Sequence, residues 1–408
     1  MKKQLFAVIC ALTLISTACT KPIPENPGET PDSPIVLSAA GTSNCYLVNK
    51  AGYYSFDATV RGNGATTIGL DQPKAIAADS AALVWQTTTG MIGEVTFKEG
   101  FINFKLADIR GNALIAATDS KGEILWSWHI WFPEEEPKTY RTLSGFDVMN
   151  MNLGAMTEQY DIIGADSLGV KPYGLLYQWG RKDPFPASGT HFGTTETVGV
   201  DLFDINGNKV TIDKSPWDNV DDNTISFSIA HPTTCMSNYY QFVRSRDWLR
   251  DDLSNRSLWG NPLEEGRGVK SFYDPCPVGY RVPDPNVFEY ATTSGGLSMD
   301  AAEFNVMDVN QDGVINAEDW TSGWYIEMED GYSLFPAAAR YDGSYAMLYG
   351  SKSGLWGSYW GNAGMDSDYG TGLGVCVLSF QNEYNVQMLS PWGAASRADA
   401  YSVRCIKE

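Results

Sequence analysis

Short apolar runs separated by turn residues fill the chain between residues 35 and 133. Tyr53–Val60 and Ala82–Thr87 are rich in aromatic and β-branched residues, and two further pairs of runs flank turns that end at Gly100 and Gly122. Consecutive runs of this kind, without a stretch of helical periodicity, are typical of β-hairpins. The pattern predicts an all-β sandwich of immunoglobulin-like size over residues 35–133.

The last of these runs, Leu125–Phe132, is apolar on both faces. With the two-residue period of a strand, one face carries Trp126, Trp128, Ile130 and Phe132, and the other carries Leu125, Ser127, His129 and Trp131. Such a strand is expected at the centre of a sheet or covered on both sides. We interpret the tryptophans as core residues and His129 as a hydrogen-bonded core histidine. A stacking platform for a sugar ring is the alternative.

The first residues have the pattern of an export signal. Lys2 and Lys3 precede an apolar run, Leu5–Ile15, which is much shorter than the roughly 20 residues needed to span a bilayer. Small residues then lead to Cys19. This order resembles a bacterial lipoprotein signal peptide over residues 1–18. The resemblance implies cleavage before Cys19, acylation of this residue and a membrane anchor in the outer membrane, at the cell surface or facing the periplasm. An ordinary secretory signal with an unmodified cysteine is the alternative.

Proline and acidic residues mark two connecting segments. Residues 19–34 contain five prolines and several acidic residues, a composition that predicts an extended tether. Residues 134–138 read Glu-Glu-Glu-Pro-Lys and predict a linker between domains. The second domain then extends over residues 139–408. Within it, the Asn206-Gly207 pair lies between two short apolar runs and predicts a hairpin turn.

Five sequence blocks of the second domain follow one another in a characteristic order. They are Met151–Ala155, Gly174–Phe185, Cys276–Pro283, Leu334–Arg340 and Tyr401–Cys405. In this order the blocks resemble the Fibrobacter succinogenes major paralogous domain family, which is common in surface lipoproteins of Bacteroidetes-type bacteria. The resemblance implies a loop-rich α+β domain with a C-type-lectin-like fold. It also implies that the C-terminal strand pairs near the start of the domain.

Seven cysteines are present, without a C-x-x-C motif, which argues against a zinc ribbon or a thioredoxin-like site. The resemblance makes Cys276 and Cys405 a plausible disulfide, and two buried thiols are the alternative. The pairing of Cys45, Cys235 and Cys376 stays open, because sequence alone cannot fix connectivity.

One motif has the spacing of a calcium loop, in an insertion near residues 300–325. Oxygen ligands are expected from Asp308, Asn310, Asp312, the carbonyl of Val314, Asn316 and Asp319, at loop positions 1, 3, 5, 7, 9 and 12. Gly313 at position 6 permits the sharp bend. Because position 12 is Asp, the loop resembles the dockerin form. We predict one structural calcium ion, with a metal-free cluster of Asx turns as the alternative.

Charge and composition narrow the function. The 408 residues include 29 basic and 49 acidic side chains, a net charge of −20, which argues against nucleic-acid binding. No catalytic motif such as G-x-S-x-G is found. We therefore predict a non-catalytic binding or adhesion role with a glycan or protein ligand. An envelope enzyme acting on polysaccharide and a fimbrial-tip adhesin subunit are the alternatives. The aromatic, Gly-rich stretch Tyr341–Trp360 is a candidate for recognition, and core packing is its alternative interpretation.

Overall fold

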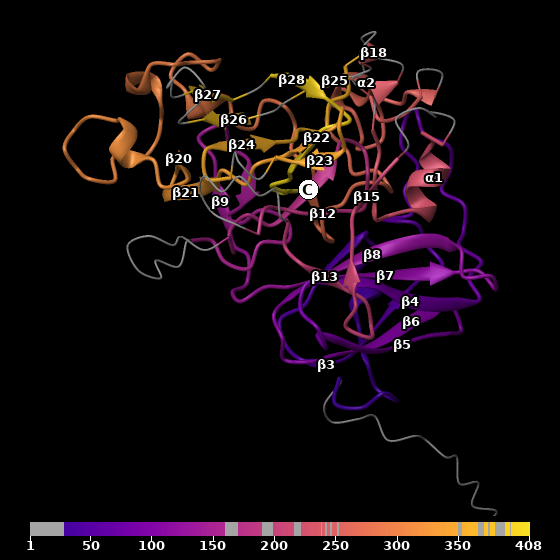
Figure 1. Cartoon of the computed structure of the whole chain (residues 1–408). Helices are drawn as coiled ribbons and strands as arrows, with labels where there is room; N and C mark the ends of the chain where they lie inside the picture. The colour runs from indigo at the N-terminus through magenta and orange to yellow at the C-terminus, as the bar shows by residue number, and fades with distance from the viewer. Residues whose placement is uncertain are drawn as a thin grey trace, which may run out of the picture.

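The described part of the chain is built mainly of β-strands, and its helices are short (Figure 1). In this computed structural model the described residues are 28–159, 170–189, 199–215, 222–237, 239–240, 243–244, 247–250, 253–349, 353–365, 371–373, 376–379, 388–391 and 393–408. The predicted signal peptide and Cys19 lie outside these ranges. No helix within them is long and apolar enough to cross a membrane. The prediction of a β-rich fold is confirmed.

Two sheets form the N-terminal region. The first has the order β1-β3-β6-β5, with β1 (Ile35–Val36), β3 (Gly52–Asp57), β6 (Phe101–Leu106) and β5 (Ile92–Lys98). The second has the order β14-β13-β4-β7-β8-β2, with β14 (Lys209–Val210), β13 (Leu202–Phe203), β4 (Ser80–Gln86), β7 (Gly111–Thr118), β8 (Ile124–Phe132) and β2 (Cys45–Leu47). All runs expected between residues 53 and 132 are therefore strands. The hairpin turn expected at Asn206-Gly207 joins β13 to β14.

Aromatic side chains fill the space between these two sheets. The ring of Phe56 lies 5.1 Å from that of Trp128 and 5.0 Å from that of Tyr46. Strand β8 pairs with β7 on one side and, in parallel, with β2 on the other. Seven of its nine residues are buried. It is therefore an inner strand covered on both faces, and its tryptophans are core residues, as its pattern predicts.

The C-terminal region consists of short strands in several small sheets. One sheet has the order β19-β30-β10-β9, with β19 (Tyr280–Arg281), β30 (Ile406–Lys407), β10 (Asp147–Met149) and β9 (Thr139–Arg141). A larger sheet contains β12 (Phe185–Pro186), β11 (Leu175–Gln178), β29 (Ala400–Ser402), β24 (Trp356–Tyr359), β26 (Cys376–Ser379), β27 (Met388–Ser390), β22 (Tyr341–Asp342) and β23 (Met347–Leu348). The C-terminal strand β30 thus pairs with β10 near the start of the region.

The remaining elements are two-stranded pairs and short helices. The pairs are β15 (Asp213–Lys214) with β16 (Thr234–Cys235), β17 (Tyr239–Tyr240) with β18 (Val243–Arg244), β20 (Gly323–Met328) with β21 (Gly331–Pro336), and β25 (Thr371–Leu373) with β28 (Ala394–Ser396). The helices are α1 (Ile225–Ala230), α2 (Pro262–Glu265), η1 (Leu37–Ala40), η3 (Glu289–Ala291), η4 (Ala301–Glu303) and η5 (Ala317–Asp319).

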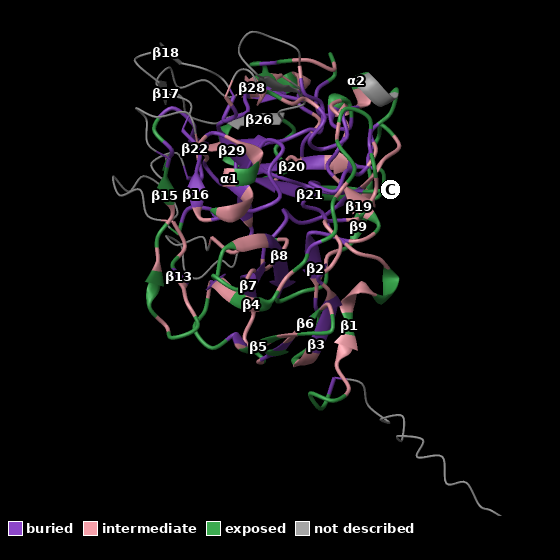
Figure 2. Ribbon diagram, turned by 90° about the vertical axis from the view of Figure 1, so that its right-hand side faces the viewer, coloured by how far each residue is buried: buried purple, intermediate pink, exposed green. Residues whose placement is uncertain are grey.

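One hydrophobic core extends through both regions. It runs from Cys45 and Trp128 in the N-terminal sheets to Trp179, Trp360 and Val403 in the C-terminal region. Figure 2 shows buried strands on both sides of the boundary between the regions. The hairpin β13–β14 also crosses this boundary, because Phe203 pairs with Gln86 of β4. The two regions therefore fold against each other along a continuous buried surface.

Candidate functional sites

The second sequence block, Gly174–Phe185, docks on β8 through a buried ion pair. The Lys182 ammonium lies 2.7 Å from a carboxylate oxygen of Asp183, and both side chains are almost fully buried. Ser127 on β8 donates its hydroxyl hydrogen to Asp183 (2.6 Å) and accepts from Lys182 (2.5 Å). The ammonium also lies 4.6 Å from the centre of the Trp126 ring. This cluster holds the second block in a fixed position against β8.

A lysine in such surroundings resembles a catalytic amine, because burial lowers its pKa to about 8 although Asp183 opposes the shift. The neighbouring hollow, lined by Gly180, Arg181, Lys182 and Trp248 among others, has a volume of only about 10 Å³. That is room for one water molecule at most. The lysine is therefore a structural residue in this arrangement.

A second buried cluster has the residue types of a cysteine protease centre. The sulfur of Cys45 lies 3.3 Å from Nδ1 of His129, and Nε2 of His129 lies 2.8 Å from Oδ1 of Asn112. Asn112 donates its amide hydrogen to the carbonyl of Gly154, so its oxygen faces the histidine. The histidine proton is then on Nε2, and Nδ1 accepts from the thiol.

Electrostatics and burial oppose catalysis at this cluster. Burial raises the pKa of the Cys45 thiol and lowers the pKa of His129 to about 3. Both groups are therefore neutral at pH 7, whereas a nucleophilic cysteine needs a thiolate. Cys45 has no exposed surface and His129 is 1% exposed. The cluster joins β2, β7 and β8 to the first sequence block, and His129 is the hydrogen-bonded core histidine that its pattern predicts.

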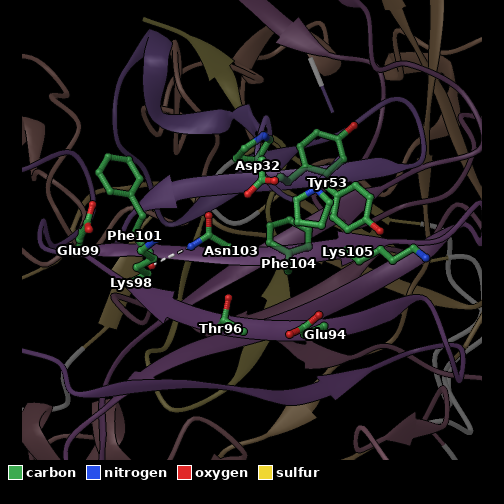
Figure 3. A pocket seen from close by; sticks show the side chains of 13 residues that line it. Asp32, Tyr53, Glu94, Thr96, Lys98, Glu99, Phe101, Asn103, Phe104 and Lys105 are labelled. Carbon is green, nitrogen blue, oxygen red and sulfur yellow. Dashed lines mark hydrogen bonds between the residues drawn. The ribbon is translucent and has the colours of Figure 1, made fainter. Parts of the chain in front are cut away.

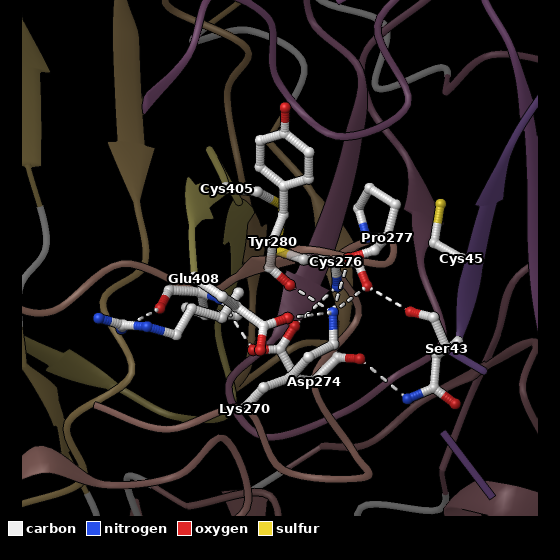
Figure 4. Close-up of a disulfide and its surroundings, with 12 residues drawn as sticks. Ser43, Cys45, Lys270, Asp274, Cys276, Pro277, Tyr280, Cys405 and Glu408 are labelled. Atoms are coloured by element: carbon white, nitrogen blue, oxygen red, sulfur yellow. Dashed lines mark hydrogen bonds and ion pairs between the residues drawn. A yellow bond between two sulfur atoms is a disulfide. The ribbon is translucent and has the colours of Figure 1, made fainter. Parts of the chain in front are cut away.

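Cys276 and Cys405 form a disulfide that closes 129 residues of chain (Figure 4). Beside it, Lys270 donates to the carbonyls of Cys276 (2.8 Å), Pro277 (2.7 Å) and Tyr280. Asp274 accepts from the amides of Cys276 and Val282, both at 2.8 Å. Burial raises the pKa of Asp274 to about 6, against the opposing charge of Lys270. These bonds fix the third block around the disulfide.

The disulfide block also contacts the N-terminal region. Ser43 donates its hydroxyl hydrogen to the carbonyl of Cys276, 2.6 Å away, and Asn44 donates to the carbonyls of Phe272 and Asp274. Cys45 and Cys235 are free and buried. Burial raises the pKa of Cys235 to about 12, so neither thiol is ready to react. The side chain of Cys376 lies outside the described part of the chain.

The first and last sequence blocks meet at a buried arginine. Arg404 donates through Nε and Nη2 to the side-chain oxygen of Asn152, and through Nη1 to the hydroxyl of Ser333. Its guanidinium also lies 4.0 Å from the centre of the Phe335 ring, in the fourth block. The blocks that carry the family resemblance thus lie together inside the molecule, where they stabilise the fold.

The predicted calcium loop is curled around its own backbone amides. Asp308 accepts from the amides of Asp312 (3.3 Å) and Gly313 (2.7 Å), and Asp312 accepts from the amide of Val314 (2.8 Å). Gly313 has a φ of +86°, which glycine adopts without strain. Asn316 caps η5 by accepting from the amide of Glu318.

Asp319 closes this loop from inside the fold. Its carboxylate is buried and accepts from the amides of Val309 (2.7 Å), Asn310 (3.4 Å) and Asn316 (2.8 Å). Within the described ranges no group of three His, Cys, Asp or Glu side chains is arranged to hold a metal ion. A carboxylate has about four lone-pair sites, so oxygens that accept one amide keep capacity for a cation. The loop has the donor types for calcium in a hydrogen-bonded arrangement.

The aromatic stretch Tyr341–Trp360 mainly contributes to the core. Tyr341, Tyr359 and Trp360 are buried, and Tyr345 is 56% exposed. Sequence reasoning missed the Cys45–His129–Asn112 cluster, because its members come from three strands and share no motif. It also missed the Ser127–Lys182–Asp183 cluster, because the lysine and the aspartate lie in one sequence block whereas Ser127 comes from the distant strand β8. No protein-family model matches the chain, and no curated protein or solved structure is significantly similar to it.

Proposed function

We propose that this protein is a lipid-anchored lipoprotein of the bacterial outer membrane, with a non-catalytic binding or adhesion role toward a glycan or protein ligand. The signal pattern before Cys19 supports the anchor. The observation that supports a structural rather than a catalytic use of the sequence blocks is that they converge on buried clamps. These are the Cys276–Cys405 disulfide, the Arg404–Asn152 hydrogen bonds and the Lys182–Asp183 pair.

The finer fold assignment belongs to the same proposal. Two facing N-terminal sheets are compatible with a β-sandwich of immunoglobulin-like size. The short strands and the pairing of β30 with β10 are compatible with a C-type-lectin-like domain of the major paralogous family. We also propose one structural calcium ion at Asp308, Asn310, Asp312, Val314, Asn316 and Asp319, where it would fix an insertion of the domain.

An envelope enzyme would need an accessible nucleophile or acid–base pair. The Cys45–His129–Asn112 cluster does not provide one, because it is sealed and neutral. This cluster therefore gives no support to the alternative of an envelope enzyme, and binding without turnover stays the proposal.

The anchor is tested in cells that express the full chain with a clickable fatty acid in the medium. We expect label on the protein and its recovery with outer membranes, and Cys19→Ala should abolish both. Cys10→Ala is the matched control, because Cys10 lies within the apolar run of the signal and should leave labelling intact. Equal labelling of the Cys19 variant, or recovery of the unmodified protein in the soluble fraction, would show that the lipoprotein assignment is wrong.

A further inference from the structure

An open groove lies on the outward face of the sheet β1-β3-β6-β5. The period of two residues places Tyr53 of β3, Phe101 and Asn103 of β6, and Glu94 and Thr96 of β5 along it. The inward-facing neighbours Ile102 and Phe104 are buried in the core. The groove has a volume of about 480 Å³, within the range of about 300–1,000 Å³ that is typical of small-molecule sites. Figure 3 shows these side chains around the hollow.

The end of the predicted tether forms one wall of this groove. Pro31, Asp32 and Pro34 line it. Their segment is fixed because the Tyr53 amide donates to the carbonyl of Gly28 (2.8 Å), and the Gly28 amide donates to the carbonyl of Ser33 (2.7 Å). Prolines lose little conformational entropy when they are ordered. The wall is therefore preformed, which reduces the cost of binding a ligand.

The groove combines aromatic surfaces with a polar floor. Phe101 is 37% exposed. The Lys105 ammonium lies 5.6 Å from the centre of the Tyr53 ring, on the directly opposite residue of the neighbouring strand. Between the two rings lies Asn103, paired with Ser55 on one side and Thr96 on the other. Rings offer apolar faces to C–H groups, whereas amide and hydroxyl groups exchange hydrogen bonds with ligand hydroxyls.

Charge and backbone geometry select among possible ligands. The lining carries three carboxylates, Asp32, Glu94 and Glu99, and two ammonium groups, Lys98 and Lys105, which gives no excess positive charge for phosphate. The other edge of the groove, β5, is an edge strand with a register shift between Ile92 and Val95. Bulges and lysines on an edge strand oppose the addition of a peptide strand. A second hollow of about 460 Å³ is lined by Glu134, Glu135 and Glu136 among others, and no aromatic ring lines it. It therefore offers a ligand no stacking surface.

We propose that this groove binds a short neutral oligosaccharide, with Phe101 and Tyr53 as stacking surfaces and Asn103 and Thr96 as hydrogen-bonding partners. The proposal rests on the binding role proposed above and gives it a site and a ligand class. Because the wall begins at Pro31, only twelve residues after Cys19, the groove lies on the side of the molecule from which the anchor would extend.

The test uses the chain from Thr20 onward and isothermal titration with a panel of soluble gluco-, manno-, galacto- and xylo-oligosaccharides. We expect at least one to bind. Phe101→Ala and Asn103→Ala should each weaken this binding about tenfold, the loss of one favourable contact. Tyr332→Ala is the matched control, because Tyr332 is 41% exposed on β21 and should leave affinity unchanged. Phe101→Leu keeps an apolar residue on β6 but removes the aromatic ring. It should therefore weaken oligosaccharide binding in a folded protein even if Phe101→Ala unfolds.

The outcomes separate this proposal from the broader one. Oligosaccharide binding that ignores both groove variants would overturn the groove and leave the binding role intact. If no member of the panel binds, the assignment of the groove to an oligosaccharide is also overturned. Repeated conversion of a bound oligosaccharide to product would overturn the non-catalytic role. If the groove variants lost this conversion, the result would still support the groove as the ligand site.

Discussion

The N-terminal and C-terminal regions of this chain are stabilised in different ways. In the N-terminal region, strands of six to nine residues such as β3 and β8 form continuous ladders around an aromatic core. In the C-terminal region many strands have only two to four residues, and each contributes few ladder hydrogen bonds. A disulfide and buried charged side chains such as Arg404 and Lys270 fix its loops. The contrast shows that one core can combine regular strands with loops fixed by specific clamps.

Buried charges are weak contributors to stability, because desolvation opposes the interactions that they gain. Their value here is geometric. Arg404 reaches Asn152, Ser333 and the carbonyl of Leu334, so one side chain joins the end of the chain to two other chain segments. If this contrast is correct, perturbing a clamp should affect the C-terminal region more than the N-terminal sheets.

The largest effect is expected from removing the disulfide. Its loop of 129 residues corresponds to about 5 kcal/mol of chain entropy in the unfolded state. We expect the double variant Cys276→Ala, Cys405→Ala to lose free energy of unfolding of about this size in denaturant titrations. Hydrogen exchange should show the greatest loss of amide protection around β10, β29 and β30. Cys235→Ala, at a free buried thiol, is the control for cysteine removal alone.

Equal loss of protection in β3, β5 and β6 would break the comparison, because the shared core would then make both regions unfold as one unit. An unchanged free energy of unfolding would show that the disulfide does not constrain the chain.

The second prediction concerns the N-terminal region and uses the pH dependence of the free energy of unfolding. The folded pKa of His129 is lowered to about 3, below the unfolded value of about 6.5. The folded state therefore binds this proton less readily. The stability that the neutral His129 contributes is present above pH 6.5 and is lost as the pH falls toward 3. About 2 kcal/mol of the free energy of unfolding is lost at pH 5. Denaturant titrations at pH 7 and pH 5 measure this loss.

His129→Gln removes the titration and keeps a side chain that can donate to Asn112. The difference in stability between wild type and variant should shrink by about 2 kcal/mol from pH 7 to pH 5. The comparison of the two proteins is needed because Asp274, with a pKa raised to about 6, acts in the opposite direction. Its contribution is present at low pH and is lost as the pH rises through 6. Parallel pH curves for the two proteins would contradict the prediction.

The contrast between the regions also explains what the sequence could predict. The N-terminal strands follow from a two-residue apolar period and glycine turns, which are local signals. The parallel pairing of β2 with β8 and the addition of β13 to β4 are not local, because they join residues far apart in the chain. Their registers depend on the shared core rather than on any motif.

The same reasoning applies to the sites. The position of Asp308 and its neighbours in one loop follows from their spacing, since a short loop brings its own residues together. The alternation that exposes Thr96 and Asn103 is equally visible in the sequence. The groove wall at residues 31–34 could not be predicted from the sequence, because its proline-rich composition is typical of an extended tether. Only the contact between Gly28 and Tyr53 makes that segment part of a groove.

The smallest effect is expected at the proposed calcium loop, which would be a clamp made from oxygen ligands instead of sulfur. Calcium at a few times its dissociation constant should raise the free energy of unfolding by about 1 kcal/mol, seen as a higher melting temperature than in chelator. The double variant Asp308→Ala, Asp312→Ala should lose this increment. Asp204→Ala is the control, since Asp204 also accepts turn amides, those of Asn206 and Asn208, in a hairpin without the calcium spacing. If calcium and chelator give the same melting curve for the wild type, the loop is a cluster of Asx turns, and hydrogen bonds alone fix the insertion.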